Sequence, residues 1–173
     1  MKIERLPGPA ILVMGVLANS EAAYSEAGSR AEQIFGPLFR RTLPVPFEEF
    51  SRYYENEMGP GLMRSYWAFT EKVPRGSLVE AKLATNRIEK DMSSNSLRTV
   101  NLDPGLLSPE SLVMATTKPY SHRVYLSKGI YGELAFMFRK DGGVNPLPWT
   151  YPDYRGPIAV DFFSGVRKEV LLS

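Results

Sequence analysis

The sequence contains no cysteine and only one histidine, His122. The lack of cysteine excludes disulfides, iron–sulfur clusters, thiolate zinc sites and cysteine nucleophiles, and it is compatible with a reducing cytosol. A single histidine also excludes the usual His-rich zinc sites. Any metal would need oxygen ligands from carboxylates, as Mg²⁺ and Mn²⁺ prefer. The composition therefore leaves a carboxylate-bound Mg²⁺ or Mn²⁺ ion as the only metal cofactor still open.

Neither sign of charge dominates, because 21 Lys and Arg residues stand against 19 Asp and Glu residues and both signs are spread along the chain. A basic arm or an acidic tail is therefore absent, and we expect no nucleic-acid partner. Long hydrophobic runs are absent too: the longest, residues 9–18, is shorter than the roughly 20 residues that cross a bilayer. We expect a cytoplasmic protein with no membrane partner, and nothing in the sequence indicates an oligomeric state.

The apolar run near the N-terminus has two interpretations. Lys2 and Arg5 precede it and small residues follow it, as in a secretory signal peptide. Residues 11–17 also have the length and β-branched content of a buried strand, and Asn19 and Ser20, which can cap a helix, come directly after them. We favour the strand.

The remaining composition is typical of a folded domain. Of the 173 residues, 43% are hydrophobic and 12% aromatic, which argues against disorder. A chain of this length buries roughly 70% of its unfolded surface without help from disulfides or metals. We expect one domain spanning residues 1–173.

Hydrophobic periodicity and turn residues predict the order of elements. The predicted elements are a helix over 20–35, an extended or edge segment over 38–47, a loop over 50–61, a strand over 62–73, a helix over 78–92, a strand over 98–103 ended by a turn at 103–105, a strand over 112–117, a hairpin over 122–138, an aromatic loop over 149–155 and a C-terminal helix from Pro157. This order predicts an α+β fold, a single-domain sandwich in which helices pack on one face of a mixed or antiparallel sheet. It also admits a ferredoxin-like core.

The hairpin is specific enough to predict a register. Residues 127–129 form a three-residue loop with Gly129 at a positive φ. The predicted pairs are Leu126 with Ile130, Tyr125 with Tyr131, Val124 with Gly132 and Arg123 with Glu133. One face of the hairpin is then polar and aromatic. The opposite face, with His122, Val124, Leu126, Ile130, Leu134, Phe136 and Phe138, is predicted to join the core.

Polar side chains gather on the regular elements between residues 78 and 133, where packing alone would favour apolar ones. The candidates for binding a ligand are Lys82, Asn86, Arg98, Asn101, Lys118, Arg123 and Tyr131. The candidates for acid–base catalysis or metal binding are Glu89, Asp103 and Glu133, with His122 as a further catalytic candidate. In this hypothesis Lys82, Lys118 and Arg123 hold a phosphate-bearing or other anionic small molecule, with or without Mg²⁺.

A purely structural interpretation of the same residues also stands. In it, the polar stripe of helix 78–92 is a solvated face, Arg123 and Glu133 form an ordinary cross-strand ion pair, and His122 is a structural residue. Convergence of the charged residues in one concave pocket would favour the ligand hypothesis.

Several motifs are missing. The chain has no G-x-x-x-x-G-K-[ST] phosphate loop, no G-x-G-x-x-G sequence and no G-x-S-x-G elbow. A conventional GTPase, Rossmann enzyme or serine hydrolase is therefore not indicated. Aromatic segments at 53–54 and 149–154 could stack on a ligand or form a recognition surface, and the second interpretation leaves open an alternative class, a non-catalytic interaction module that binds a protein partner.

The sequence resembles a known family across nearly its whole length. The blocks that carry the resemblance lie at residues 101–105, 115–118, 122–126, 129–133 and 149–154, with shorter motifs at 53–54, 57–59 and 85–89 in the same order. They resemble the prokaryotic family catalogued as domain of unknown function 4416. The resemblance implies a single-domain cytoplasmic protein of bacteria or archaea and supports the strand at 11–17. It implies no activity and no catalytic residues, and the "GTP-binding" label of some members has no motif to support it here.

Overall fold

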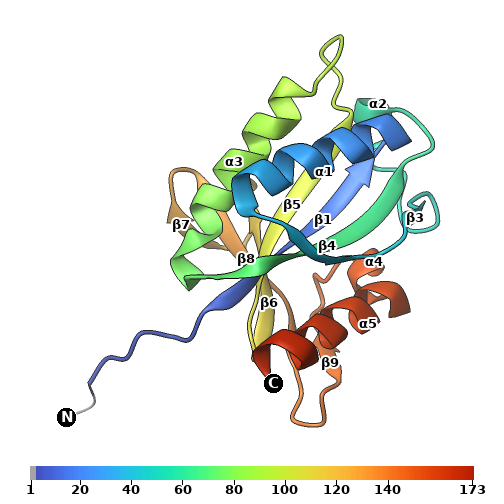
Figure 1. The fold of residues 1–173 in the computed structure, drawn as a ribbon. Helices are drawn as coiled ribbons and strands as arrows, with labels where there is room; N and C mark the ends of the chain where they lie inside the picture. The colour runs from blue at the N-terminus through green and yellow to red at the C-terminus, as the bar shows by residue number, and fades with distance from the viewer. Residues whose placement is uncertain (1–2) are drawn as a thin grey trace.

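A computed structural model describes residues 3–173 (Figure 1). The strands are β1 (Ala10–Ala18), β2 (Leu38–Arg41), β3 (Val45–Pro46), β4 (Met63–Val73), β5 (Val100–Leu107), β6 (Ser111–Thr116), β7 (Val124–Ser127), β8 (Ile130–Phe138) and β9 (Val144–Pro146). The helices are α1 (Glu21–Phe35), α2 (Glu55–Met58), α3 (Leu78–Asp91), α4 (Pro152–Arg155) and α5 (Pro157–Val166), with short turns η1 (Arg75–Ser77) and η2 (Arg167–Leu171). The α+β prediction is confirmed. No described helix is long and apolar enough to cross a membrane.

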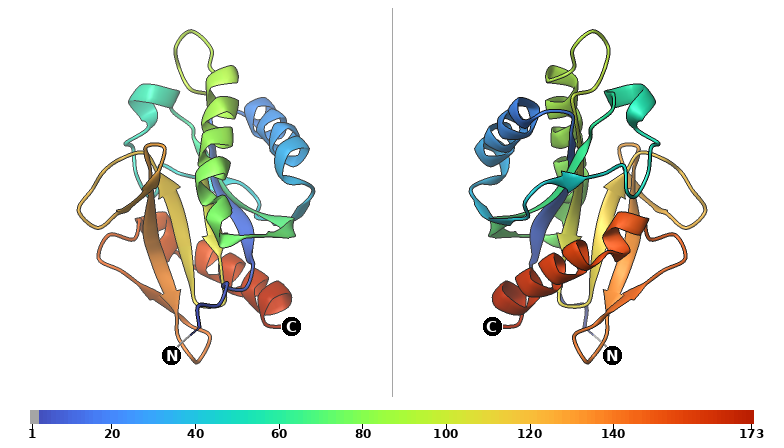
Figure 2. Two further views of the ribbon diagram at one scale, coloured as in Figure 1. Left: turned by 90° about the vertical axis from the view of Figure 1, so that its left-hand side faces the viewer. Right: turned by 90° about the vertical axis from the view of Figure 1, so that its right-hand side faces the viewer.

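The sheet contains a ferredoxin-like core. Its order is β2-β4-β1-β5-β6-β8-β7, with β3 beside β4 and β9 beside β8, and its pairs are antiparallel. The chain order β1-α1-β2-β4-α3-β5 with spatial order β2-β4-β1-β5 is that of the β-α-β-β-α-β unit. Strands β6, β8 and β7 extend this core beyond β5 (Figure 2).

Strand β1 lies at the centre of the sheet and is buried along its whole length. Its even-numbered residues pack in the cluster under α1 and α3, while Ile11 and Val13 face α5. Because a strand covered on both faces needs apolar residues at every position, a continuous run replaces the usual alternation. The strand predicted at 11–17 is confirmed.

Helices α1 and α3 lie side by side on one face of the sheet (Figure 2). Ser20 caps α1, since its side chain accepts a hydrogen bond from the Ala23 amide, and Gly36 ends the helix at φ 85°. Both predicted helices are confirmed within two residues at each end. Ile34, which the helical spacing assigns to the packed face, is more than half exposed.

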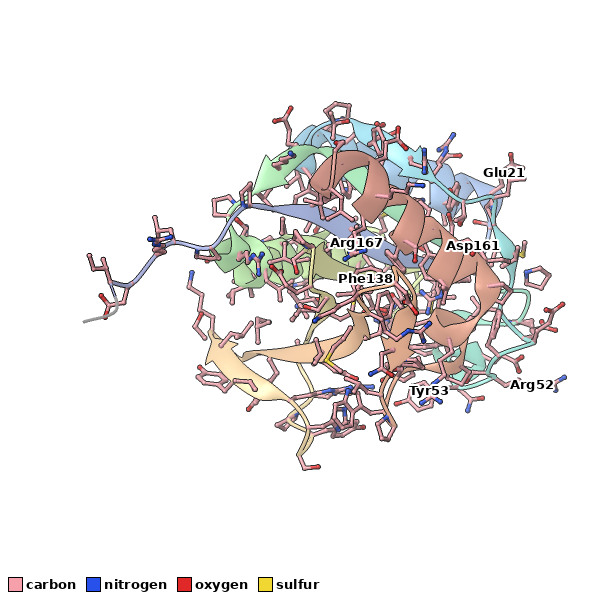
Figure 3. The ribbon with its side chains drawn as sticks, turned by 90° about the horizontal axis from the view of Figure 1, so that it is seen from below. Glu21, Arg52, Tyr53, Phe138, Asp161 and Arg167 are labelled. Carbon is pink, nitrogen blue, oxygen red and sulfur yellow. The ribbon has the colours of Figure 1, made fainter. Side chains whose placement is uncertain are left out.

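The opposite face of the sheet is covered by α4 and α5, so the expectation of helices on one face only is wrong. Phe162, Phe163 and Val166 of α5 pack against Tyr66 and other residues that point down from the sheet. Figure 3 shows α5 from below, with Arg167 beside Phe138, and the guanidinium lies 4.3 Å from the ring centroid. A ferredoxin-like core has both helices on one face, so the second apolar face requires this additional layer.

Strand β5 continues through residues 103–105, where the sequence predicted a turn. Leu102 directs its N–H and C=O away from β1, and Pro104, two residues on, faces the same way. The missing N–H of Pro104 therefore costs no hydrogen bond to β1. A proline is tolerated in a strand where its nitrogen faces an open edge.

The hairpin differs from the prediction near its turn. Val124 pairs with Gly132 and Tyr125 with Tyr131 as predicted, but Ser127 pairs with Ile130 around a two-residue turn with Lys128 at φ 51° and Gly129 at φ 78°. The register shift falls at Leu126, so its predicted pairing with Ile130 is wrong. Val124 and Leu126 are exposed because β7 is an edge strand, and His122, in the turn before β7, is half-buried. The sequence also did not predict the short α2 and β9.

Candidate functional site

A cavity of about 930 Å³ lies where β5 and β6 separate. These strands pair only through residues 105–107 of β5, so the first half of β5 has no neighbour on that side. Helix α3 lies along one wall, α4 and the 150–154 segment along another, and residues 47–57 complete the enclosure. The split in the sheet thus creates a hollow lined by side chains from both layers.

Most of the predicted site residues converge on this cavity. Those lining it are Lys82, Asn86, Glu89, Arg98, Asn101, Asp103, Lys118, Arg123 and Glu133. The other two do not line it. His122 stacks on Trp149 with ring centroids 4.9 Å apart, and its Nε2 lies 3.4 Å from Glu133 Oε1, while Tyr131 packs on Tyr125. His122 is thus placed behind the wall that Glu133 forms.

Two α3 side chains replace the missing strand beside β5. Glu89 Oε1 accepts a hydrogen bond of 2.6 Å from the Leu102 amide, and Lys82 Nζ donates one of 3.0 Å to the Leu102 carbonyl. Lys82 and Glu89 are both buried, so the interpretation of this stripe as a solvated face is wrong. An unpaired buried backbone group is costly, and the spacing of seven residues sets the two side chains two turns apart along one face of α3.

Burial disfavours the charged form of Glu89 and raises its pKa above the ordinary value, although Lys82, the Leu102 amide and Arg98 act in the opposite direction. Arg98 Nη1 donates to Glu89 Oε2 at 3.1 Å and to Asn101 Oδ1 at 2.8 Å, while its Nη2 donates to Glu57 Oε2 at 2.7 Å. Arg98 therefore connects α2, α3 and β5 across one end of the cavity.

Arg123 and Glu133 form an ion pair on the far wall, with Arg123 Nε 2.8 Å from Glu133 Oε2. Both side chains are more than nine-tenths buried, unlike those of an ordinary surface pair. Arg123 Nη1 also donates to the carbonyl of Lys118 at 3.0 Å. Because removing one partner would leave a buried charge, this pair fixes the wall more firmly than a solvated pair would.

The cavity floor contains two residues that the sequence analysis missed, Arg64 and Tyr154. Arg64 is almost fully buried, with Nε 2.8 Å from Asp153 Oδ2 and its guanidinium 4.9 Å from the ring centroid of Phe47. Tyr154 Oη occupies the space in which a Cβ on Gly15 would lie, and Arg64 Nη1 would be 3.2 Å from that Cβ. The signal that could have found Arg64 is a cation near the start of β4, two residues before the aromatic and apolar run 66–69.

The protonation of both floor residues follows from their surroundings. Burial opposes the charge of Arg64, but Asp153, Tyr154, Tyr66 and Asp103 outweigh it and raise the pKa of Arg64. Burial also raises the pKa of Tyr154, so its phenol stays neutral and remains a hydrogen-bond donor. The floor thus presents a permanent cation beside a protonated hydroxyl.

Exposed tyrosines surround the cavity mouth. Tyr53, Tyr120 and Tyr151 come from three separate loops, line the cavity and are 67%, 52% and 52% exposed. Lys118 Nζ bonds to Tyr53 Oη at 3.3 Å, while Arg123 lies 4.3 Å from the Tyr120 ring centroid and bonds to Tyr151 Oη at 3.4 Å. Figure 3 shows Tyr53 at the periphery of the molecule beside Arg52.

The carboxylates proposed for Mg²⁺ are not arranged as a metal site. Within residues 3–173, no group of three or more His, Cys, Asp or Glu residues is placed to hold a metal ion. Glu89 is paired with Arg98, Asp103 with Lys82 and Glu133 with Arg123. Each of these carboxylates is therefore engaged in an ion pair with a basic side chain.

The model of the family called domain of unknown function (DUF4416) matches residues 8–169. The match covers the ferredoxin-like core, its extension and every cavity residue named above, so the chain belongs to this family. No curated protein and no solved structure matches the chain.

Proposed function

We propose that the cavity binds a small molecule through an anionic group held at its floor. The observation that carries the proposal is a set of buried hydrogen-bond donors at the floor that have no acceptor. Among the described residues, Arg64 Nη1, Arg98 Nε and Tyr154 Oη are buried atoms of cavity-lining residues without a hydrogen-bond partner. All three can donate, and buried polar groups in native proteins are nearly always satisfied. A ligand that supplies acceptor oxygens would satisfy them.

The charge pattern supports the same assignment. The cavity is lined by the basic residues Arg64, Lys82, Arg98, Lys118 and Arg123 and by the acidic residues Glu57, Glu89, Asp103, Glu133 and Asp153. Ion pairs use every acidic member, whereas Lys118 takes part in none within the described chain. The five basic and five acidic side chains balance in formal charge, but Arg98 pairs with both Glu57 and Glu89, so Lys118 is the lining cation that these ion pairs leave over.

The anion contacts differ from those that the sequence suggested. Lys82 is committed to the Leu102 carbonyl and Asp103, and Arg123 to Glu133. Arg64 pairs with Asp153 through Nε, which leaves its Nη1, together with Tyr154 Oη and Lys118, for the ligand. Of the three proposed catalytic carboxylates, Asp103 has the most exposed side chain, at 29% against 9% for Glu89 and 7% for Glu133. Asp103 is therefore the general-base candidate if the bound molecule is transformed.

The arrangement of the aromatic segments favours this proposal over a protein-interaction module. Tyr53, Tyr54 and Tyr151 all line the cavity together with the charged residues. The charged groups thus meet in a concave site, which is the arrangement expected of a ligand pocket. The cytoplasmic location, the prokaryotic origin and the lack of a nucleic-acid partner remain predictions.

Thermal unfolding in the presence of acetate, malonate and inorganic phosphate tests the proposal. A ligand at about 100 times its Kd stabilises the folded state by about 2.7 kcal/mol, so at least one anion should raise the melting temperature when chloride at equal ionic strength does not. The shift should shrink in Tyr154→Phe and persist in Tyr125→Phe, whose hydroxyl lies outside the cavity. No shift with any anion would overturn the proposal.

A further inference from the structure

We infer that the bound molecule is an aromatic carboxylic acid whose carboxylate meets Arg64 and Tyr154 at the floor and whose ring lies among the tyrosines of the mouth. This inference rests on the proposed function and adds the chemical class of the ligand. It follows from three separate features of the cavity: its floor, its mouth and its size.

The floor favours a carboxylate over a phosphate. Arg64 Nε is paired with Asp153, so Arg64 Nη1 and the Tyr154 phenol supply the free donors, and the two oxygens of one planar carboxylate can accept from both. Asp153 pairs with Arg64, and Asp103 also lines the cavity. A phosphate dianion would add two negative charges beside these carboxylates, whereas a carboxylate adds one. Like charges in a poorly hydrated site repel strongly.

The mouth favours a flat ring. Exposed tyrosines from three loops converge there, and Lys118 and Arg123 hold them in place through their hydroxyls and ring faces. Holding these side chains in advance lowers the entropy lost when a ligand binds. Aromatic rings prefer offset or edge-to-face contact with other aromatic rings. A planar ligand can therefore contact two or more of these tyrosines at once.

The size of the cavity requires more than an anion. Pockets for drug-sized molecules span roughly 300–1,000 Å³, and this cavity, at about 930 Å³, lies near the upper end. A carboxylate on the floor alone would leave most of the volume to water. A body of fused rings attached to the carboxylate would reach from the buried Arg64 toward the exposed Tyr53 and Tyr151.

Calorimetric titration of the full chain with four matched probes tests the inference. The probes are naphthalene-2-carboxylate, naphthalene-2-carboxamide, decahydronaphthalene-2-carboxylate and 2-naphthyl phosphate. Naphthalene-2-carboxylate should bind most tightly. The neutral amide should bind about 10- to 100-fold more weakly because it loses a charge-assisted hydrogen bond. The saturated acid should bind about 3- to 10-fold more weakly because it cannot stack.

Variants separate the two ends of the ligand. Tyr151→Leu and Tyr53→Leu, at exposed positions where unfolding is not expected, should weaken the aromatic acid and leave the saturated acid unchanged. Tyr154→Phe should weaken both acids to the same degree, because it acts at the carboxylate. Tyr125→Leu removes an exposed tyrosine outside this cavity and should change neither affinity.

The outcomes distinguish the inference from the proposed function. Equal affinity for the aromatic and saturated acids overturns the ring assignment, and tighter binding of the phosphate overturns the carboxylate assignment, while both leave an anion site in place. Equal affinity for the acid and its amide overturns the anion contact and the proposed function with it. If no probe binds although acetate or malonate raises the melting temperature, only the aromatic class is lost.

Discussion

Tyr154 Oη lies against Gly15 in the space that the Cβ of any other residue would fill. Gly15 is in the middle of the central strand β1, and Tyr154 reaches it from α4 on the opposite layer. The Tyr154 ring is held by Tyr66 at 5.2 Å and by Phe163 at 6.0 Å between ring centroids. The missing side chain at position 15 thus makes room for the phenol at the cavity floor.

The first prediction concerns this contact. Gly15→Ala should destabilise the protein by about 1–3 kcal/mol, the usual cost of overpacking a core, because the new methyl group must displace the phenol. In a Tyr154→Phe background the cost should be smaller, since the clashing oxygen is gone. Urea unfolding of the two single variants and the double variant measures the coupling.

Gly28→Ala provides a matched control, because a Cβ at Gly28 would meet only Trp67 Cη2 at 3.7 Å, an ordinary contact. Gly28 lies inside α1, so this change should stabilise the helix by about 0.5–1 kcal/mol. Additive costs for Gly15→Ala and Tyr154→Phe would contradict the proposed contact.

The second prediction tests the role of Lys82 beside β5. Lys82→Met should lower the free energy of unfolding by about 1–3 kcal/mol, because the Leu102 carbonyl loses its donor in a buried setting. Lys90→Met, on the exposed face of the same helix, should change it by less than about 0.5 kcal/mol. Equal urea midpoints for the two variants would show that Lys82 does not support the edge of β5.

The third prediction follows from the raised pKa of Glu89. A carboxyl whose folded pKa lies above its ordinary value of 4.5 binds its proton more tightly in the folded state. Its contribution to stability is therefore fully present below about pH 4.5 and is lost as the pH rises through the folded pKa. The stability of the unmodified protein minus that of Glu89→Gln should fall as the pH rises from 4 to 7.

Taking the difference between two proteins cancels the titration of groups that both share, so the slope reports on position 89. Chemical unfolding at a series of pH values gives this difference directly. A difference that stays level would mean that the Lys82 and Arg98 cations cancel the effect of burial, and one that grows with pH would mean that they outweigh it.

The fourth prediction concerns the enclosure of the cavity by the segment around α2. Arg98 holds this segment through Glu57, at 2.7 Å, so Glu57→Gln should speed amide hydrogen exchange in residues 47–62. Glu55→Gln, two residues away, removes only a longer contact, at 3.8 Å, to the exposed Arg52 side chain and should leave the exchange unchanged. Identical exchange in both variants would show that the Arg98 contact does not hold the segment.

Local patterns were sufficient to predict the parts of the fold in which one chemical feature decides the outcome. The apolar run of β1, the cap at Ser20 and the positive φ of Gly129 are of this kind, and the order of the elements indicated the ferredoxin-like core. Pro104 and Leu126 were misassigned for a tertiary reason. Whether a proline nitrogen or an apolar side chain faces a neighbour depends on which edge of the sheet is open, and sequence spacing does not show this.

In the candidate site, too, sequence patterns indicated some of the residues and missed others. A concentration of polar residues on α3, β5 and β8 indicated the walls, because those side chains interrupt expected apolar patterns. The floor residues could not be predicted from such patterns. Arg64 lies within a strand, and Tyr154 lies in an aromatic segment 90 residues further along the chain. Only packing of α4 beneath β1 brings them together at Gly15. His122 lies in the turn before the edge strand β7 and stacks on Trp149, so it does not line the cavity.

Anomalous diffraction from crystals grown with 4-bromobenzoate tests the central claim most directly, because the bromine position reports the orientation of the ligand. The account predicts one ordered bromine between Tyr53 and Tyr151 and a carboxylate within hydrogen-bonding distance of Arg64 Nη1 and Tyr154 Oη. A bromine bound at another surface while Arg64 and Tyr154 remain without an anionic partner would contradict it.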